Sequence, residues 1–117
     1  MNLTYHDVKN ALYAAGLDVW YPAAKQGVCL TPYVVVQNMG TFPYAQSSRL
    51  MYTLLSIHCY VPLGNYDGLK ILVGRVRDAL APLMPDLRPV GNESVHTVND
   101  TFRAHETYLE YIVQKKA

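Results

Sequence analysis

The chain contains 117 residues, of which 50% are hydrophobic. That length is enough for one domain with a buried core and too short for two, so we expect a single domain over residues 1–117. Ten basic and nine acidic side chains leave a formal charge of +1, which excludes recognition of nucleic acid through a strong overall positive charge.

A membrane protein and a secreted, disulfide-stabilised protein are both disfavoured. No apolar run approaches the roughly 18 residues that a membrane-spanning helix needs. Cys29 and Cys59 show no CxxC spacing, and the first residues do not resemble a signal peptide. We therefore expect a soluble protein with reduced thiols and no membrane partner.

The chain is rich in tyrosine, with ten tyrosines against two phenylalanines and one tryptophan. Tyrosine combines an apolar ring with a polar tip, which suits surfaces that become buried on assembly. It is also favoured at half-buried positions of strands, so the composition alone leaves both explanations open.

The first element is expected to be a helix that starts after Thr4. Thr4 has the character of an N-cap, Asp7 places an acidic group in the first turn, and Gly16 suits a left-handed C-terminal cap. The apolar residues at helical spacing between them are Val8, Leu12 and Ala15. Residues 17–21 then have the composition of a strand, which Pro22 ends.

A central strand is expected next, from Thr31 to Gln37, because this segment is rich in β-branched and aromatic residues. Pro32 stands near its start, where the missing N–H costs least. The residues from 38 to 48 are rich in Asn, Gly, Pro and Ser, so we expect a connection of about ten residues, longer than a usual hairpin loop. Such long connections often carry function.

The segment from Arg49 to Val61 alternates between two kinds of side chain, as a half-buried strand does, and Pro62 ends it. One face carries Met51, Leu55, Ile57, Cys59 and Val61, and the other carries Tyr52, Ser56, His58 and Tyr60. We expect the first face to pack in the core and the second to be exposed.

A second helix is expected to begin at residues 65–68 and to end at Pro82 and Pro85. Its apolar stripe consists of Leu69, Leu72, Val73, Val76, Leu80 and Leu83, with Arg75, Arg77 and Asp78 on the exposed side. A short strand at 87–90, a polar loop or frayed hairpin at 91–100 and an alternating strand at 102–113 complete the chain. The order α-β-β-β-α-β-β predicts an α+β fold with a largely antiparallel sheet and two helices packed on one face.

The sequence contains no coherent active site. The histidines and cysteines lack the short paired spacings of zinc modules, and no GxxxxGK[ST] loop occurs. His58 and Cys59 are neighbours on a strand and point to opposite faces, so they cannot form a thiolate–imidazole pair. Glu106 and Glu110 share a face of the last strand, where solvated carboxylates explain them better than a catalytic pair. We predict a protein that is not an enzyme and holds no metal or cofactor.

Six stretches of the chain share the order and local pattern of a known family. They are residues 15–17 at the end of the first helix, 19–22, 31–36, 56–61, 66–69 at the start of the second helix, and 104–111. Together they resemble the tail-terminator, or tail-completion, proteins of long-tailed bacteriophages and related tail-like particles.

This resemblance implies a structural protein of the virion, made in the host cytoplasm. It would cap the tail tube as a hexameric ring, stop tail polymerisation and form the tail side of the head–tail junction. Its partners would be copies of itself, the tail-tube protein and the head-completion or connector protein. DNA would pass the ring lumen only transiently, and the near-neutral charge predicts weak contact; Arg49, Arg75, Arg77 and Arg103 would line a channel only if the fold brought them together.

A ring requires a head-to-tail contact between two different surfaces of the subunit. We expect one surface to be the exposed sheet face or its edge, and the other to include the 38–50 connection and the outer face of the second helix. The candidate subunit-interface residues are Asn38, Met39, Tyr44, Arg49, Tyr52, Tyr60, Arg75 and Tyr108.

Two other classes of function remain open from the sequence. The first is a small-molecule-binding regulatory α+β domain that acts at a subunit interface, which would usually be fused to or encoded beside an enzyme. The second is a small enzyme with a tyrosine or histidine as acid and base, which the lack of a coherent constellation disfavours.

Overall fold

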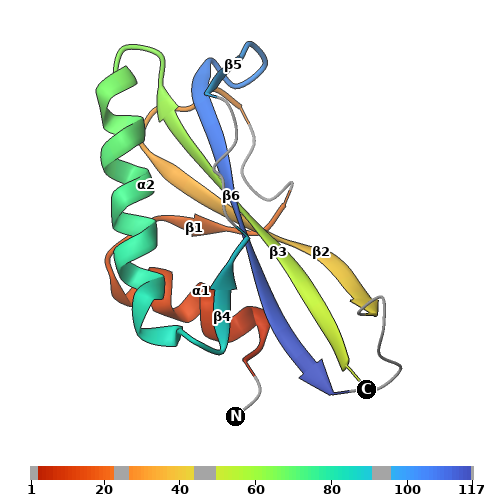
Figure 1. Ribbon diagram of the computed structural model, residues 1–117. Helices are drawn as coiled ribbons and strands as arrows, with labels where there is room; N and C mark the ends of the chain where they lie inside the picture. The colour runs from red at the N-terminus through yellow and green to blue at the C-terminus, as the bar shows by residue number, and fades with distance from the viewer. Residues whose placement is uncertain (1–2, 23–26, 44–49, 91–95, 117) are drawn as a thin grey trace.

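The computed structural model describes residues 3–22, 27–43, 50–90 and 96–116 (Figure 1). Its elements, in chain order, are α1 (Tyr5–Ala14), β1 (Val19–Trp20), β2 (Tyr33–Pro43), β3 (Leu50–Pro62), α2 (Tyr66–Leu80), the short 3-10 helix η1 (Ala81–Leu83), β4 (Leu87–Pro89), β5 (Thr97–Asn99) and β6 (Ala104–Lys116). The predicted α+β class and the order α-β-β-β-α-β-β are confirmed, with β5 as a short strand inside the segment expected to be a loop or hairpin. Residues 91–95 of that segment lie outside the described chain.

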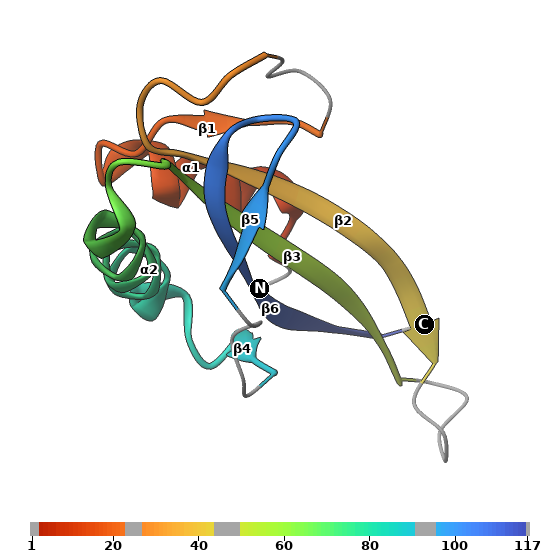
Figure 2. The same cartoon turned by 90° about the horizontal axis from the view of Figure 1, so that it is seen from above.

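The strands form one six-stranded sheet in the order β1-β2-β3-β6-β4, with β5 paired to β6 beside Ala104–Glu106. All pairs are antiparallel except β1 with β2, which run parallel over two residues. The three long strands extend well beyond the helices, as Figure 2 shows, and the molecule measures 47 × 26 × 24 Å.

Both ends of α1 are fixed by local hydrogen bonds that the sequence predicted. At the start, the Thr4 N–H donates to the Asp7 carboxylate (2.8 Å) and the Asp7 N–H donates to the Thr4 hydroxyl (3.3 Å), which is a capping box. At the end, Gly16 adopts a φ of 83°, its N–H donates to the Tyr13 carbonyl, and the Leu17 N–H donates to the Leu12 carbonyl. This pair of bonds is a Schellman motif.

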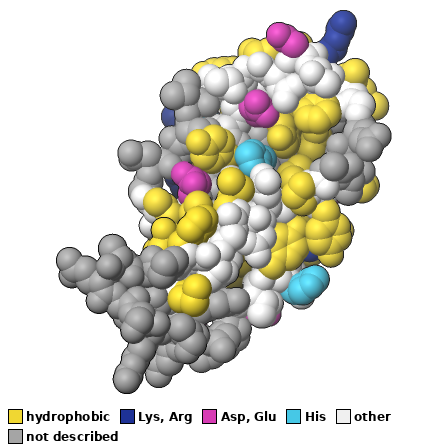
Figure 3. All heavy atoms as spheres, turned by 90° about the vertical axis from the view of Figure 1, so that its right-hand side faces the viewer, with side chains coloured by type: hydrophobic (Ala, Val, Ile, Leu, Met, Phe, Trp, Pro, Cys, Tyr) yellow, Lys and Arg dark blue, Asp and Glu magenta, His cyan; other side chains and the backbone are white. Residues whose placement is uncertain are grey.

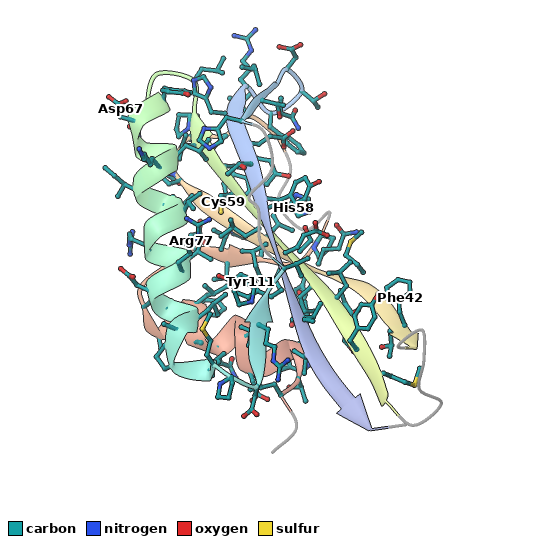
Figure 4. All side chains as sticks on the ribbon, viewed as in Figure 1. Phe42, His58, Cys59, Asp67, Arg77 and Tyr111 are labelled. Atoms are coloured by element: carbon teal, nitrogen blue, oxygen red, sulfur yellow. The ribbon has the colours of Figure 1, made fainter. Side chains whose placement is uncertain are left out.

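Both helices pack on the same face of the sheet, as predicted. Apolar residues of α1 and α2 meet one side of β2, β3 and β6 in a single core. Its central members are Val8, Leu12, Val34, Val36, Leu55, Ile57, Cys59, Leu69, Val73, Val76, Leu109 and Tyr111. Figure 4 shows Cys59 and Tyr111 on the α2 side of the strands and His58 on the other side, as the alternation of the strand requires.

The prediction of a connection over residues 38–48 is wrong for its first part, because β2 continues to Pro43. The pairing with β3 skips Met39, which makes a β-bulge between Asn38 and Gly40. The Asn38 side-chain oxygen accepts the Gly40 N–H (2.8 Å), and Gly40 has a φ of 111°. Asn and Gly therefore mark a bulge inside a strand here, and residues 44–48 of the expected connection lie outside the described chain.

Candidate interaction surface

The side of the sheet opposite the helices, which we call the open face, carries no helix among the described residues. Directly paired residues point to the same side of a sheet, so the strand register defines the members of this face. They are Tyr33, Val35, Gln37 and Phe42 from β2, Tyr52, Leu54, Ser56, His58 and Tyr60 from β3, and Glu106, Tyr108, Glu110 and Ile112 from β6. Figure 3 views this side and shows patches of hydrophobic side chains around acidic groups and a histidine, with basic groups only toward its edges.

Aromatic rings occupy the centre of the open face. Tyr33 and Tyr60 pair across β2 and β3 and stack with ring centroids 4.9 Å apart. His58 and Tyr108 pair across β3 and β6 with centroids 5.5 Å apart, and Tyr108 is 40% exposed. The rings of Tyr33 and Tyr60 are almost fully buried, so His58 and Tyr108 carry the accessible aromatic surface at this place.

One end of the open face is covered, contrary to the expectation that Tyr60 is exposed. The Tyr60 side chain is only 9% exposed, because Tyr33 stacks on it and the edge of the Phe102 ring packs against it at 5.9 Å. The segment around Cys29 lies over this end, where the Cys29 N–H donates to the Phe102 carbonyl at 2.7 Å. Tyr60 therefore lies below the accessible surface of the open face, where it packs against Tyr33 and Phe102.

The other end of the open face depends on the bulge at Met39. Before the bulge the odd-numbered residues of β2 point to the open face, and after it Phe42 does. Phe42 and Tyr52 face each other across β2 and β3 with ring centroids 5.6 Å apart. The bulge thereby extends the aromatic surface to the far end of the long strands.

A hollow of about 170 Å³ opens on the covered end of the face. It is lined by Pro22, Tyr33, Val35, Gln37, His58, Tyr60 and Phe102. Pockets for small molecules and cofactors usually measure about 300–1,000 Å³. The hollow therefore has room for the end of one long side chain and is too small for a typical cofactor.

The titratable groups around this hollow are held in their neutral forms. Burial lowers the pKa of His58, and the negative charges of Glu106 and Glu110 partly offset that shift. Burial raises the pKa of Tyr33 to about 12, with the Cys29 thiol and Glu106 adding to the effect. Burial and then Glu106 also raise the pKa of Tyr60. Near neutral pH the phenols of Tyr33 and Tyr60 and the ring of His58 therefore add no charge to the open face.

The open face contains a serine and a histidine in contact, but their setting does not match a hydrolase. The Ser56 hydroxyl lies 3.2 Å from Nε2 of His58, yet Ser56 is only 3% exposed and does not line the hollow. Within the described chain, no carboxylate hydrogen-bonds to the His58 ring to orient it as a base. The pair is consistent with a buried polar contact of the sheet.

No three His, Cys, Asp or Glu side chains of the described chain lie close enough together to hold a metal ion. Cys59 is buried in the main core, as predicted. Cys29 is buried in the smaller cluster with Tyr33, Tyr60 and Ala104, which the sequence did not indicate.

The predicted interface residues fall into three groups. Tyr52, Tyr60 and Tyr108 belong to the open face. Asn38 and Met39 lie together at the bulge of β2, where both are exposed. Tyr44 and Arg49 lie outside the described residues, and Arg75 lies apart from the others on α2, where Nη2 donates to the Ala15 carbonyl at 3.3 Å.

The described arginines among the candidate channel-lining groups are divided between α2 and the turn before β6. Arg75 and Arg77 belong to α2, and Arg77 lies near the buried ring of Tyr111 (Figure 4). Arg103 lies in the turn before β6 with a φ of 51°. The described part of the chain therefore presents no cluster of these arginines for contact with DNA.

A second surface lies on the outer side of α2; the sequence analysis expected the outer face of this helix in the second interface but named none of the residues below. We call it the α2 outer surface; it consists of Tyr66, Asp67, Lys70, Ile71 and His96, which border a surface depression of about 610 Å³. Ile71 is 66% exposed and Tyr66 is 57% exposed. The signal available in the sequence was Ile71 itself, which falls outside the apolar stripe of the helix.

None of the described helices is long and apolar enough to cross a membrane. No model of a protein family matches the chain, and a search of curated proteins finds no match either.

Proposed function

We propose that this chain is a tail-terminator-like structural protein of a bacteriophage or a related tail-like particle. In this role it caps the tail tube as a hexameric ring, stops tail polymerisation and forms the tail side of the head–tail junction. Its partners are further copies of itself, the tail-tube protein and the head-completion protein, with DNA passing only transiently. It acts in the virion without a cofactor and without catalysis.

The open face is the observation that carries this proposal. A sheet normally buries its apolar faces against another layer, and an exposed aromatic surface marks a site of interaction. Tyrosine and phenylalanine are enriched in protein interfaces. The open face carries Tyr108 near its centre and Phe42 and Tyr52 toward the far end of the strands.

The presence of a second, unlike surface supports assembly into a ring. The α2 outer surface exposes Tyr66 and Ile71 on the helix layer, which is separate from the open face. A contact between two unlike surfaces is heterologous, and it gives a closed ring when the rotation between neighbours closes. A twofold dimer would instead use the same patch on both partners.

The alternative function is a small-molecule-binding regulatory domain. The hollow on the open face is smaller than usual ligand pockets. The depression beside α2 has the volume of a ligand pocket, but it is bordered by largely exposed side chains and would leave a ligand open to solvent. The small size of the first and the openness of the second favour contact with protein over capture of a ligand. The neighbouring genes distinguish the two functions. Capsid, connector and tail-tube genes beside this gene would support the tail-terminator role, and metabolic genes would support the regulatory domain.

The direct test is assembly on the tail tube, observed by electron microscopy. The chain is mixed with the tail-tube protein encoded beside it, and we expect rings at tube ends and tubes that stop growing. Tyr108→Asp should abolish capping because it places a charge in the centre of the open face. Tyr13→Asp, on the exposed side of α1, is the matched control and should cap normally. Uncapped tubes of unlimited length with the unaltered chain would refute the proposal.

A further inference from the structure

The open face carries two carboxylates that lack a cationic partner in the described chain. Glu106 and Glu110 are half-buried on β6. The Glu106 carboxylate accepts hydrogen bonds from neutral donors, among them the Thr97 hydroxyl at 3.5 Å, the Asn99 amide at 3.4 Å and the Tyr60 hydroxyl. No described lysine or arginine forms an ion pair with either glutamate. The face is therefore negatively charged as well as aromatic.

The hollow beside Glu106 has the lining that a cationic side chain prefers. Tyr33, Tyr60 and Phe102 line the hollow on the side where Glu106 pairs with Tyr60, and such rings give an apolar wall to the stem of a long side chain. The partly buried Glu106 carboxylate beside them attracts the positive charge at its end. The volume of about 170 Å³ fits the end of one long side chain.

The α2 outer surface carries an exposed cation. Lys70 lies there between the exposed side chains of Tyr66 and Ile71, and no described carboxylate forms an ion pair with it. The exposed Asp67 carboxylate belongs to the same surface, which therefore offers one cation and one anion beside an aromatic and an aliphatic group. It lies on the helix layer, so within one molecule Lys70 cannot reach the open face on the other side of the sheet.

We propose that the open face of one copy binds the α2 outer surface of a second copy, with Lys70 of the second copy entering the hollow beside Glu106. This inference rests on the proposed ring, because it specifies the head-to-tail contact between neighbouring subunits. The pairing of Lys70 on one surface with Glu106 on the other sets the direction of the contact. Ile71 and Tyr66 cover the neighbouring apolar rings of the open face.

The first test is a disulfide cross-link between copies. Ile71→Cys and Tyr108→Cys are introduced together into the full chain, which is concentrated and oxidised. The two positions lie on different layers of one molecule, so a bond between them must join two copies and should give a ladder of dimers and higher species. Tyr13→Cys with Tyr108→Cys is the control pair, since Tyr13 is also exposed. Equal cross-linking of the two pairs would overturn the inference.

The second test is a reversal of charge, read by sedimentation of the concentrated chain. Glu106→Lys and Lys70→Glu should each weaken self-association about tenfold, and the double variant should recover most of the loss, as expected for a close charge pair. Asp86→Lys, an exposed change away from both surfaces, should leave association unchanged. If Glu106→Lys unfolds, Glu110→Lys replaces it. If self-association of the double variant is weakened by the sum of the two single losses, with no recovery, the inference is overturned.

The two proposals can fail separately. Rings on tail tubes without a cross-link between positions 71 and 108 would keep the proposed function and reject this contact. The cross-link in a chain that does not cap tubes would keep the contact and reject the proposed function.

Discussion

Tyr33 shows how a single side chain of the open face contributes to stability. Its phenol lies under the aromatic surface, where burial raises its pKa from 10.0 to about 12. A raised pKa means that the folded chain favours the neutral phenol more than the unfolded chain does. The stabilisation is therefore complete below pH 10 and is lost as the pH rises toward about 12.

The raised pKa of Tyr33 leads to a prediction for Tyr33→Phe. Phenylalanine keeps the ring and removes the titration, so the free energy of unfolding should fall less between pH 10 and about 12 than in the unaltered chain. Urea unfolding at a series of pH values measures the difference. Tyr60, whose pKa burial also raises, should keep part of the alkaline loss in the variant. Tyr13→Phe serves as the control, and an identical pH profile for Tyr33→Phe and the unaltered chain would contradict the prediction.

At the scale of elements, the helices obey local rules and can be tested with two glycines. Gly16 has a φ of 83°, which an L side chain rarely adopts, whereas Gly74 lies inside α2 with open space where a Cβ would be. Gly16→Ala should therefore lower the free energy of unfolding by about 1 kcal/mol or more. Gly74→Ala should raise it by about 0.5–1 kcal/mol because alanine favours a helix.

Denaturant unfolding of the two glycine variants measures both effects under one condition. Each change adds the same methyl group, so the opposite signs isolate the backbone conformation as the cause. Destabilisation of equal size in both variants would instead indicate that added volume decides the outcome.

The strand β2 shows where local rules give the wrong element. Asn38 and Gly40 favour a turn, and the same residue types also favour a bulge, in which one residue lies outside the register. The choice between the two depends on whether a neighbouring strand continues alongside. β3 continues to pair as far as Pro43, and this partner is distant in sequence.

At the scale of the whole molecule, the uneven covering of the sheet is the dominant feature. Two helices cover one face, and the described residues leave most of the other face bare apart from the segment around Cys29 and Phe102. The bare area is aromatic and acidic, and the exposed side of α2 offers Lys70 and Asp67 beside apolar groups. A molecule with two unlike surfaces on separate layers is suited to chain-like or ring-like association.

The proposed contact predicts that self-association depends on salt. Raising sodium chloride from about 0.1 M to about 1 M shortens the electrostatic screening length from about 10 Å to about 3 Å. Association measured by sedimentation should therefore weaken several-fold. The variant with both Glu106→Gln and Lys70→Gln should lose most of this salt dependence, and an unchanged salt dependence would contradict a contact between these two charges.

The elements with local signals could be predicted from the sequence. The capping residues Thr4, Asp7 and Gly16 predicted both ends of α1, and the alternation from Leu55 to Val61 predicted which side of β3 enters the core. These signals suffice because hydrogen bonds within a few residues and the period of two in a strand depend on nearby residues alone. The fold class followed from the order of those elements.

Only the tertiary structure decided which side chains share a surface and how exposed they are. Tyr60 was expected at the surface and is buried, because Phe102 and the segment around Cys29 fold over it from distant parts of the chain. The hollow brings together residues from β2, β3 and the turn before β6, and Glu106 approaches it only through the register of β6 with β3. The register of the strands and the burial of side chains on the open face depend on contacts between residues far apart in sequence, so no local pattern encodes them.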